Sequence, residues 1–474
     1  MSIRDERRRW GPVLLAAVLV PLVALFIGAC GGDDDDGGGD ASDEPQASTE
    51  PIKIGILSDC EGAFGSFFEL NIGGALVPFI NRGATPVNPE KPSEGVEGAE
   101  IAGREVEFVT PFGCGDETPD VAIQETQRIM EQEDADILIG PLSGDEGIAV
   151  ANYAKENQDK TFVDGMHGAQ DSTLSVQAPN FFRYHIDGAQ WSAGAGDYAY
   201  NELGWRKAVT IGDDYSFPYT SVGGFIAEFC GVGGEVVERI WPPLGETDYA
   251  SFIAQIPEIP EEVDGIYAAV GGTGAVAFIQ QFIEQRGPLQ EGQFMGNIFY
   301  DDPLVVKELG DRIVGAIASN ETAADSNEPA AEQYVAEIEA AFPDLAEFAS
   351  SVFIDNYYKN AEGLIQGLEA VDGNIEDLEA FWEALGNAEF DAGYGHISLD
   401  ENRQAIGPNY LKQVSENPDT GKLEIKTIRR VPTTEQQFGG VFTPDTPSPD
   451  RTNPECEEAD IPWEGESEEV DFSD

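Results

Sequence analysis

Basic side chains are scarce in this chain. Its 474 residues include 26 Lys and Arg against 89 Asp and Glu, which gives a formal net charge of -63. Binding a nucleic acid requires cationic side chains that displace counterions from the phosphates. The sequence therefore argues against a nucleic-acid partner, and for the same reason against docking on an anionic membrane surface.

Histidine and cysteine are also rare, which narrows the enzyme classes. The chain has 3 His and 5 Cys, with no C-x-x-C pair and no G-x-S-x-G turn. These absences argue against thioredoxin-like redox chemistry, a cysteine zinc site and a hydrolase nucleophile turn. We predict no catalytic residue, no metal and no cofactor. The best enzyme signal is a G-x-G-x-x-A run at residues 272–277, which also suits any tight turn from a strand into a helix.

Apolar residues are abundant enough for a folded body. Hydrophobic residues make up 41% of the chain and aromatic residues 10%, more than disordered acidic proteins contain. The length predicts two or three domains. The last 34 residues, 441–474, are acidic and rich in proline, and we expect them to form a surface tail.

The first 50 residues have the pattern of an export signal and a tether. Four arginines within residues 4–9 precede an apolar stretch at 10–29 and then Cys30. Small residues before a cysteine resemble the lipobox of bacterial lipoproteins, which predicts a signal peptide at 1–30 and a lipid on Cys30. An uncleaved membrane anchor is the alternative, because the stretch is long enough to cross a bilayer. Either places the body outside the cytoplasm, with residues 31–50 as a flexible acidic tether.

The four remaining cysteines predict two disulfides. An oxidising compartment favours pairing, and four cysteines allow three pairings. We favour Cys60–Cys114, because each follows a predicted strand and such strands are often neighbours. By elimination, Cys230 would then pair with Cys456 and fix the acidic tail.

From residue 51 onward, short β-rich runs alternate with helical patterns. This alternation predicts an α/β fold built from βαβ units with parallel sheets. Four strands with their helices occupy residues 51–175, and four more occupy 205–300. This arrangement predicts two doubly wound α/β layers in tandem. Helices are expected at residues 191–203 and 345–368, and strands return after residue 396.

The loops after the predicted strands are the expected ligand site. In doubly wound sheets, ligands bind beyond the carboxyl ends of the strands. These loops contain Gly, Ser, Asp and aromatic residues with almost no Lys or Arg. They suit a small uncharged, zwitterionic or cationic solute with an apolar or aromatic part, and suit a phosphorylated ligand poorly.

Three runs carry a resemblance to a known family. Residues 52–57, 137–144 and 209–217 resemble the type I periplasmic binding proteins, and most of all the leucine/isoleucine/valine-binding proteins of ABC importers. The resemblance spans about residues 51–430. It implies two Rossmann-like lobes with parallel sheets, joined by a hinge of several crossovers that closes on the ligand.

The resemblance also implies how the chain divides between the lobes. Lobe 1 takes residues 51–180 and 322–388. Lobe 2 takes residues 181–321 and 389–440, and the tail follows.

Residues of the ligand site are carried over from the matching loops. In relatives, backbone amides and hydroxyls at helix starts meet the ligand's carboxylate, an aromatic side chain of the second lobe covers it, and an acid meets an ammonium group. The predicted ligand-binding set here is Phe64, Ser66, Ser143, Gly144, Asp145, His167, Gly168, Ala169, Asp187, Phe217, Tyr219, Gly272, Tyr300 and Asp301. Phe67, Phe68 and Phe299 add to an aromatic wall.

The sequence thus predicts an extracytoplasmic solute-binding protein of an ABC importer. It would bind an amino acid, an amide or a related solute between its lobes and deliver it to a membrane permease, as a monomer held to the membrane only by its lipid. The first alternative is a ligand sensor for a membrane receptor. The second is a secreted enzyme on the same fold.

Overall fold

The computed structural model describes residues 48–418, 420–463, 465–470 and 472. The predicted signal peptide, the lipid on Cys30 and most of the tether lie outside these residues. Among the described residues, no helix combines the length and the apolar character that crossing a bilayer requires.

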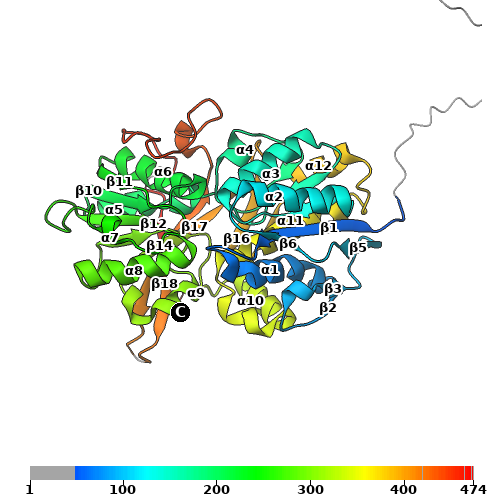
Figure 1. Ribbon diagram of the computed structural model, residues 1–474, viewed down its shortest axis with the longest axis horizontal. Coiled ribbons are helices and arrows are strands. Elements are labelled where there is room, and N and C mark those ends of the chain that lie inside the picture. Colours follow the sequence, from blue (N-terminus) through cyan, green and yellow to red (C-terminus); the bar gives the residue numbers. More distant parts are fainter. Residues whose placement is uncertain (1–47, 419, 464, 471, 473–474) are drawn as a thin grey trace, which may run out of the picture. The chain divides into compact units, whose positions relative to one another are not determined.

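The first lobe contains a sheet built mainly of parallel strands (Figure 1). Strand β1 lies at its centre with β5 and β7 on either side, and β6 pairs with the end of β1. The strands, in spatial order, are β4 (Glu100–Ile101), β5 (Arg104–Phe108), β1 (Ile52–Asp59), β7 (Ile137–Ile139), β8 (Thr161–Val163) and β9 (Phe181–Phe182), with β6 at Gly113–Gly115. A small hairpin joins β2 (Thr85–Pro86) to β3 (Val96–Glu97).

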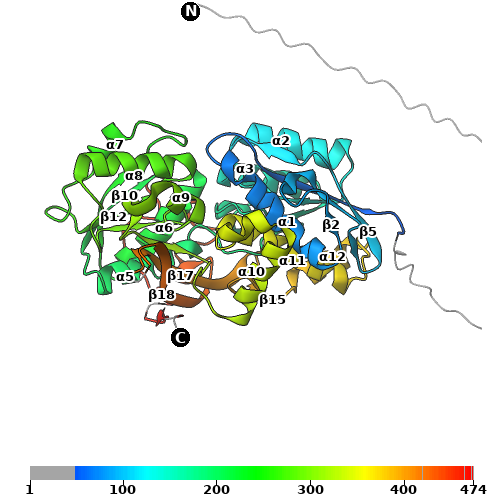
Figure 2. The ribbon, with the colours of Figure 1, turned by 90° about the horizontal axis from the view of Figure 1, so that it is seen from below.

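Helices cover both faces of this sheet because its strands are apolar on both faces. Ile137 and Ile139 of β7 face one core cluster, whereas Leu138 between them belongs to another. Helices α1, α10, α11 and α12 lie on the first side (Figure 2), and α2 and α3 lie on the second. Their bounds are α1 (Phe68–Asn81), α2 (Pro119–Gln127), α3 (Gly144–Glu156), α4 (Asp171–Leu174), α10 (Pro329–Ala341), α11 (Val352–Ala370) and α12 (Leu378–Gly386).

The second lobe has a larger sheet that is parallel in its first half and antiparallel in its second. The strands, in spatial order, are β11 (Glu235–Ile240), β10 (Lys207–Gly212), β12 (Gly265–Ala269), β13 (Phe294–Gly296), β14 (Ile317–Asn320), β17 (Ala405–Glu416), β16 (Gly395–Leu399) and β15 (Phe390–Ala392). In addition, β18 (Leu423–Thr434) pairs with β17, and β19 (Glu468–Glu469) pairs with β18. Its helices are α5 (Ala195–Asn201), α6 (Ser216–Gly231), α7 (Ala250–Ile253), α8 (Gly272–Arg286) and α9 (Pro303–Leu309). The α/β class and the two lobes predicted from the sequence are confirmed.

The chain passes between the two sheets three times. It leaves the first sheet after β9, returns to the first lobe after β14, and enters the second sheet again at β15. Helices α10 to α12 therefore belong to the first lobe although they follow most of the second. Arg183 of the first passage forms a parallel bridge with Gln404, the residue just before β17, so the first passage runs beside the chain that enters β17.

Two helix predictions were wrong at particular residues. The helix expected at 191–203 is divided into a 3-10 turn at Gln190–Ser192 and α5, because Gly194 adopts a left-handed φ of 86°. The helix expected at 345–368 is divided into a 3-10 segment, Pro343–Phe348, and α11. Ser351 caps α11 by accepting a hydrogen bond from the backbone N–H of Phe353, which starts a new helix there.

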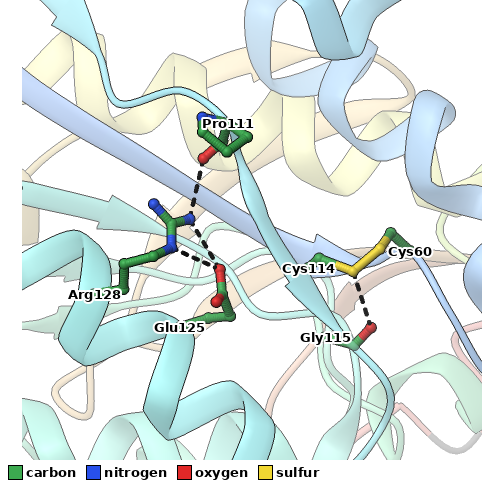
Figure 3. The surroundings of a disulfide bond; sticks show 6 residues. All are labelled: Cys60, Pro111, Cys114, Gly115, Glu125 and Arg128. Atoms are coloured by element: carbon green, nitrogen blue, oxygen red, sulfur yellow. Dashed lines mark hydrogen bonds and ion pairs between the residues drawn. A yellow bond between two sulfur atoms is a disulfide. The ribbon is translucent and has the colours of Figure 1, made fainter.

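Both predicted disulfides are present. Cys60 and Cys114 join the end of β1 to β6, with Cα atoms 5.1 Å apart (Figure 3). Cys230 of α6 is joined to Cys456, with Cα atoms 5.2 Å apart.

The acidic tail is more closely packed than a surface tail would be. Phe442, Ile461 and Trp463 are buried against Phe438, and the Trp463 ring centroid lies 4.5 Å from that of Phe438. The Trp463 Nε1–H donates to the buried carboxylate of Glu228 in α6 at 3.0 Å. In the sequence, the predicted Cys230–Cys456 disulfide was the feature that indicated a fixed tail. The acidic and proline-rich composition of the tail gave no indication that three of its apolar side chains are buried.

Replacing both Cys230 and Cys456 with Ser is expected to free the tail. In the chain-entropy model, a crosslink that closes so long a loop contributes about 5 kcal/mol, so the Tm measured without reductant should fall by several degrees. Limited proteolysis should then cut within residues 441–463. The matched variant, Cys60→Ser with Cys114→Ser, should lower the Tm and leave the tail resistant, and an equally resistant tail in both variants would contradict this assignment.

Candidate functional site

A closed cavity lies where the carboxyl ends of the strands of the two lobes meet. It measures about 10 Å³, which is room for one water molecule at most. The side chains around it are almost all apolar. They are Phe64, Leu142, Ser143, Gly144, Met166, Gly168, Trp191, Tyr215, Phe217, Ile298, Phe299 and Phe353.

Each lobe brings its residues to the cavity on loops that follow parallel strands. In the first lobe, Phe64 follows β1, Ser143 follows β7 and Gly168 follows β8. In the second lobe, Phe217 follows β10 and Phe299 follows β13. This is the ligand position of doubly wound sheets, supplied here twice and face to face.

Aromatic rings close the cavity from both lobes. The ring of Phe64 stacks on that of Phe299 across the boundary between the lobes, with centroids 5.9 Å apart and planes at 13°. Phe217 meets Trp191 edge to face at 5.7 Å and Phe299 at 6.3 Å. Such contacts favour apolar or aromatic surface in any molecule that replaces them.

Two hydrogen bonds join the lobes beside these rings. The Asp145 carboxylate at the start of α3 accepts from the backbone N–H of Ser216 at the start of α6, at 3.2 Å. The backbone N–H of Thr273 at the start of α8 donates to the Ala63 carbonyl, also at 3.2 Å. The backbones of the two lobes lie so close together here that a Cβ on Gly272, whose φ is +54°, would be 2.5 Å from the Ala63 oxygen.

Three helix N-termini therefore converge on the closed cavity. Helices α3, α6 and α8 all begin at this boundary, and the first backbone N–H groups of α6 and α8 donate across it to Asp145 and Ala63 in the closed arrangement. Together with the positive end of each helix dipole, these groups offer a partner for a carboxylate or another electron-rich group.

Two buried carboxyl groups lie behind the loop that carries Ser143. Glu146 accepts from the backbone N–H of Ser143 at 3.3 Å. A Cβ on Gly115 would lie 2.3 Å from Asp59 Oδ1 and 2.6 Å from Glu146 Oε1, so these two oxygens flank one small space. Burial raises the pKa of Asp59 to about 7, and burial together with the Asp59 charge raises the pKa of Glu146. Both shifts favour the protonated forms of these carboxyl groups.

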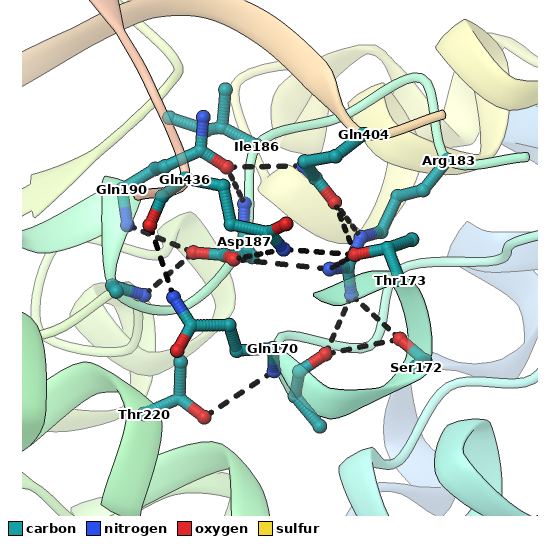
Figure 4. Close-up of polar contacts among 12 residues, drawn as sticks. Gln170, Ser172, Thr173, Arg183, Ile186, Asp187, Gln190, Thr220, Gln404 and Gln436 are labelled. Carbon is teal, nitrogen blue, oxygen red and sulfur yellow. Dashed lines mark hydrogen bonds and ion pairs between the residues drawn. The ribbon is translucent and has the colours of Figure 1, made fainter. Parts of the chain in front are cut away.

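A polar network fills the hinge next to the cavity (Figure 4). The buried guanidinium of Arg183 donates to the Ala169 carbonyl at 2.8 Å, to Thr173 Oγ1 at 2.9 Å and to Gln404 Oε1 at 2.5 Å. The Asp187 carboxylate accepts from Gln436 Nε2 at 2.8 Å and from two backbone N–H groups. Segments far apart in the sequence are tied together here. Among the described residues, no group of three or more His, Cys, Asp or Glu is placed to hold a metal ion.

Some of the predicted ligand-binding residues lie at the cavity or beside it, and the others do not. Phe64, Ser143, Gly144, Gly168 and Phe217 line the cavity. Asp145 and Gly272 lie beside it in the contacts that join the lobes.

The other predicted residues do not line this cavity. His167, Ala169 and Asp187 belong to the hinge network, where burial holds the pKa of His167 well below its ordinary value. Tyr300 lies in the core of the second lobe, where its ring centroid is 5.0 Å from that of Phe294.

Three members of the predicted set have other surroundings. The Asp301 carboxylate pairs with Lys412 and accepts from Asn320 Nδ2 at 2.8 Å. Tyr219 donates to Asp214, and Ser66 is exposed.

Sequence reasoning missed Met166, Trp191, Tyr215 and Phe353 as lining residues. Tyr215 could have been found, because it stands beside Phe217 in a loop already singled out. Trp191 and Phe353 carried no such signal. The first lies in a chain passage and the second begins a helix of the returning segment, so only the tertiary fold brings them to the cavity.

Comparisons with known proteins agree on one family. A family model described as periplasmic binding protein matches residues 51–422, and the chain belongs to this family, in its type I form. Leu/Ile/Val-binding protein homolog 6 of Brucella melitensis biotype 1 is 23% identical over 310 residues, which are 64% of this chain and 77% of that protein.

Solved structures share the fold at low sequence identity. The ABC transporter substrate-binding protein from Sphaerobacter thermophilus has a TM-score of 0.69 at 24% identity and covers 82% of this chain and 99% of its own. An ABC-transporter solute-binding protein of R. palustris in complex with benzoate has 0.68 at 24%, covering 81% and 97%. A leucine binding protein of Thermotoga maritima has 0.64 at 20%, covering 79% and 97%. Family membership implies a location outside the cytoplasm and a solute-binding role, since the relatives are solute-binding proteins and not enzymes.

Replacing Asp59 with Asn is expected to raise the Tm near pH 8 by a few degrees and to leave it unchanged near pH 4. Burial shifts the pKa of Asp59 from 3.8 to about 7 in the folded protein. Between these values the unfolded chain binds fewer protons than the folded one, so the stability of the unmodified protein falls as pH rises through this window. Thermal unfolding followed at a series of pH values measures the difference.

Asp120→Asn, at an exposed position on α2, is the matched control and should leave the pH profile unchanged. A constant Tm difference between Asp59→Asn and the unmodified protein at every pH would show that Asp59 is ionised when folded.

Proposed function

We propose that this protein captures a small solute with an apolar or aromatic part between its lobes and delivers it to the permease of an ABC importer. The observation that carries the proposal is the aromatic cavity at the carboxyl ends of the strands of both sheets. Because the closed cavity has no free volume for a solute, the lobes open to admit one. The solute then takes the place of the ring contacts that cross the boundary.

The surroundings of the acidic residues favour a solute without an ammonium group. An amino acid would need a carboxylate for its ammonium group, and no charged side chain is among the lining residues. Asp187 and Asp301, which were expected near the site, are engaged by hinge donors and by Lys412. The three helix starts offer partners for a carboxylate or an amide oxygen.

An aromatic carboxylic acid or an amide therefore fits this cavity better than an amino acid. The neighbour from R. palustris in complex with benzoate supports this choice, whereas the leucine binding protein of Thermotoga maritima stands for the alternative. We further propose that the protein is a monomer with a lipid on Cys30. The lipid and the tether would keep the binding lobes near the permease without fixing their orientation.

A thermal-shift panel tests the class of solute. Benzoate, 4-hydroxybenzoate, benzamide, L-leucine and L-phenylalanine are each titrated into the purified oxidised protein. At 100 times its dissociation constant a ligand adds about 2.7 kcal/mol to the stability of the folded state, so the Tm should rise by several degrees with benzoate or benzamide. A rise with L-leucine and none with the aromatic acids or the amide would overturn the choice of solute.

Phe217→Leu is expected to weaken binding of the responding solute about fivefold, because one aromatic wall is lost and such a contact is worth roughly 1 kcal/mol. Isothermal titration calorimetry measures the dissociation constant. The matched control is Phe225→Leu. Phe225 is equally buried in the second lobe, where it stacks on Tyr267 at 4.3 Å, and lies outside the cavity lining. Equal losses of affinity in both variants would contradict a direct contact of Phe217.

A further inference from the structure

Trp191 is the only cavity-lining residue, among those that the structure describes, that belongs to a chain passage between the lobes. Its ring is held from the cavity side by both lobes. Phe217 of the second lobe meets it edge to face at 5.7 Å. A Cβ on Gly168 of the first lobe would lie 2.6 Å from Trp191 Cζ3, so the chain after β8 passes directly against the indole.

The other side of Trp191 is bound to the hinge. Its Nε1–H donates to Glu321 Oε1 at 2.8 Å, and Glu321 follows β14 in the second passage. Its backbone carbonyl accepts from Ser319 Oγ at 2.5 Å and from Asn409 Nδ2 of β17 at 3.0 Å. Trp191 is thus hydrogen-bonded to two separate segments of the chain, one at residues 319–321 and one at Asn409.

Glu321 continues this connection into the first lobe. Its second carboxylate oxygen, Oε2, accepts from Lys359 Nζ at 2.8 Å. Lys359 lies on α11, the helix whose first turn places Phe353 at the cavity. Trp191, Glu321 and Lys359 are all buried, so these hydrogen bonds are shielded from water and strengthened accordingly.

We propose that Trp191 couples occupation of the cavity to the angle between the lobes, and that Glu321 is its positioning residue. The inference rests on the proposed function and names the device that regulates the same site. Rotation of the lobes moves Phe217 relative to Lys359, and Phe217 contacts the indole ring directly whereas Lys359 is connected to it through Glu321. Bonds that hold the ring in the closed arrangement therefore favour closure, and a solute that contacts the ring acts on the same bonds.

The chain supplies a matched pair for the test. Trp463 also donates its Nε1–H to a buried glutamate, Glu228, at 3.0 Å, but that pair joins the tail to α6 and lies away from the cavity. Either glutamate can be replaced by Gln with little change of volume. Lys359 keeps Asp355 as its partner at 2.5 Å in the Glu321→Gln variant, so no buried cation is left alone.

The experiment measures the ligand-free, oxidised protein by small-angle X-ray scattering and by tryptophan fluorescence. Glu321→Gln and Trp191→Phe are expected to raise the ratio of open to closed molecules about tenfold, equivalent to about 1.4 kcal/mol, and so to increase the radius of gyration. Glu321→Gln should also shift the emission component that Trp191→Phe removes. The controls, Glu228→Gln and Trp463→Phe, should leave the radius of gyration unchanged.

Two results would overturn the coupling. One is an unchanged radius of gyration in both hinge variants while the Trp191 emission shifts, which would make Glu321 a merely structural partner. The other is an equal increase in the control variants, which would attribute opening to general destabilisation. Neither measurement uses a ligand, so a failed solute panel and a failed coupling are distinguished from each other.

Discussion

The buried charge of Arg183 is the constraint around which the boundary between the lobes is organised. Its side chain is fully buried, with Asp164 at 3.9 Å and Asp187 at 3.8 Å. Removing a guanidinium from water is costly unless its donors are satisfied, and here carbonyl, hydroxyl and amide oxygens from several segments accept them. Those segments must therefore stay together, which places the loops after β8 and before β17 beside the first passage, at the boundary between the lobes.

The hinge must hold its segments together, whereas the cavity requires that the two lobes can separate to admit a solute. Rings such as Phe64 and Phe299 attract each other across the boundary, so apolar contact favours closure even without a solute. A binding protein that closed too firmly would exclude its solute. Among the described residues, the helix starts beside these rings are joined by the hydrogen bonds from the backbone N–H groups of Ser216 and Thr273. Such bonds contribute little net free energy, so opening remains accessible.

The fold was predictable because its signals are local, and the site was predictable only in part. The strand run at 137–139, for example, follows from periodicity, which acts over a few residues. Phe217 was predicted from the resemblance of its loop to the family, and it lines the cavity. Asp187 and Asp301 were assigned to a ligand because an acid in a loop does not reveal that Gln436 or Lys412, more than a hundred residues later, will bind it. Phe353 was missed for the same reason.

Several of the scarce cations are buried and join distant segments, whereas others, such as Lys207 and Lys307, lie on the surface. Lys359 and Lys412 are buried at the hinge, each paired with an acid from a segment distant in sequence, and Arg104 joins the edge of the first sheet to Glu376 beyond α11. Salt screens the repulsion among exposed acids but acts weakly on buried pairs. A chain with so many acids can therefore keep a strongly negative surface, provided that its cations connect the segments whose separation would open the hinge. The surface and the hinge then respond to different physical conditions, and ionic strength acts mainly on the surface.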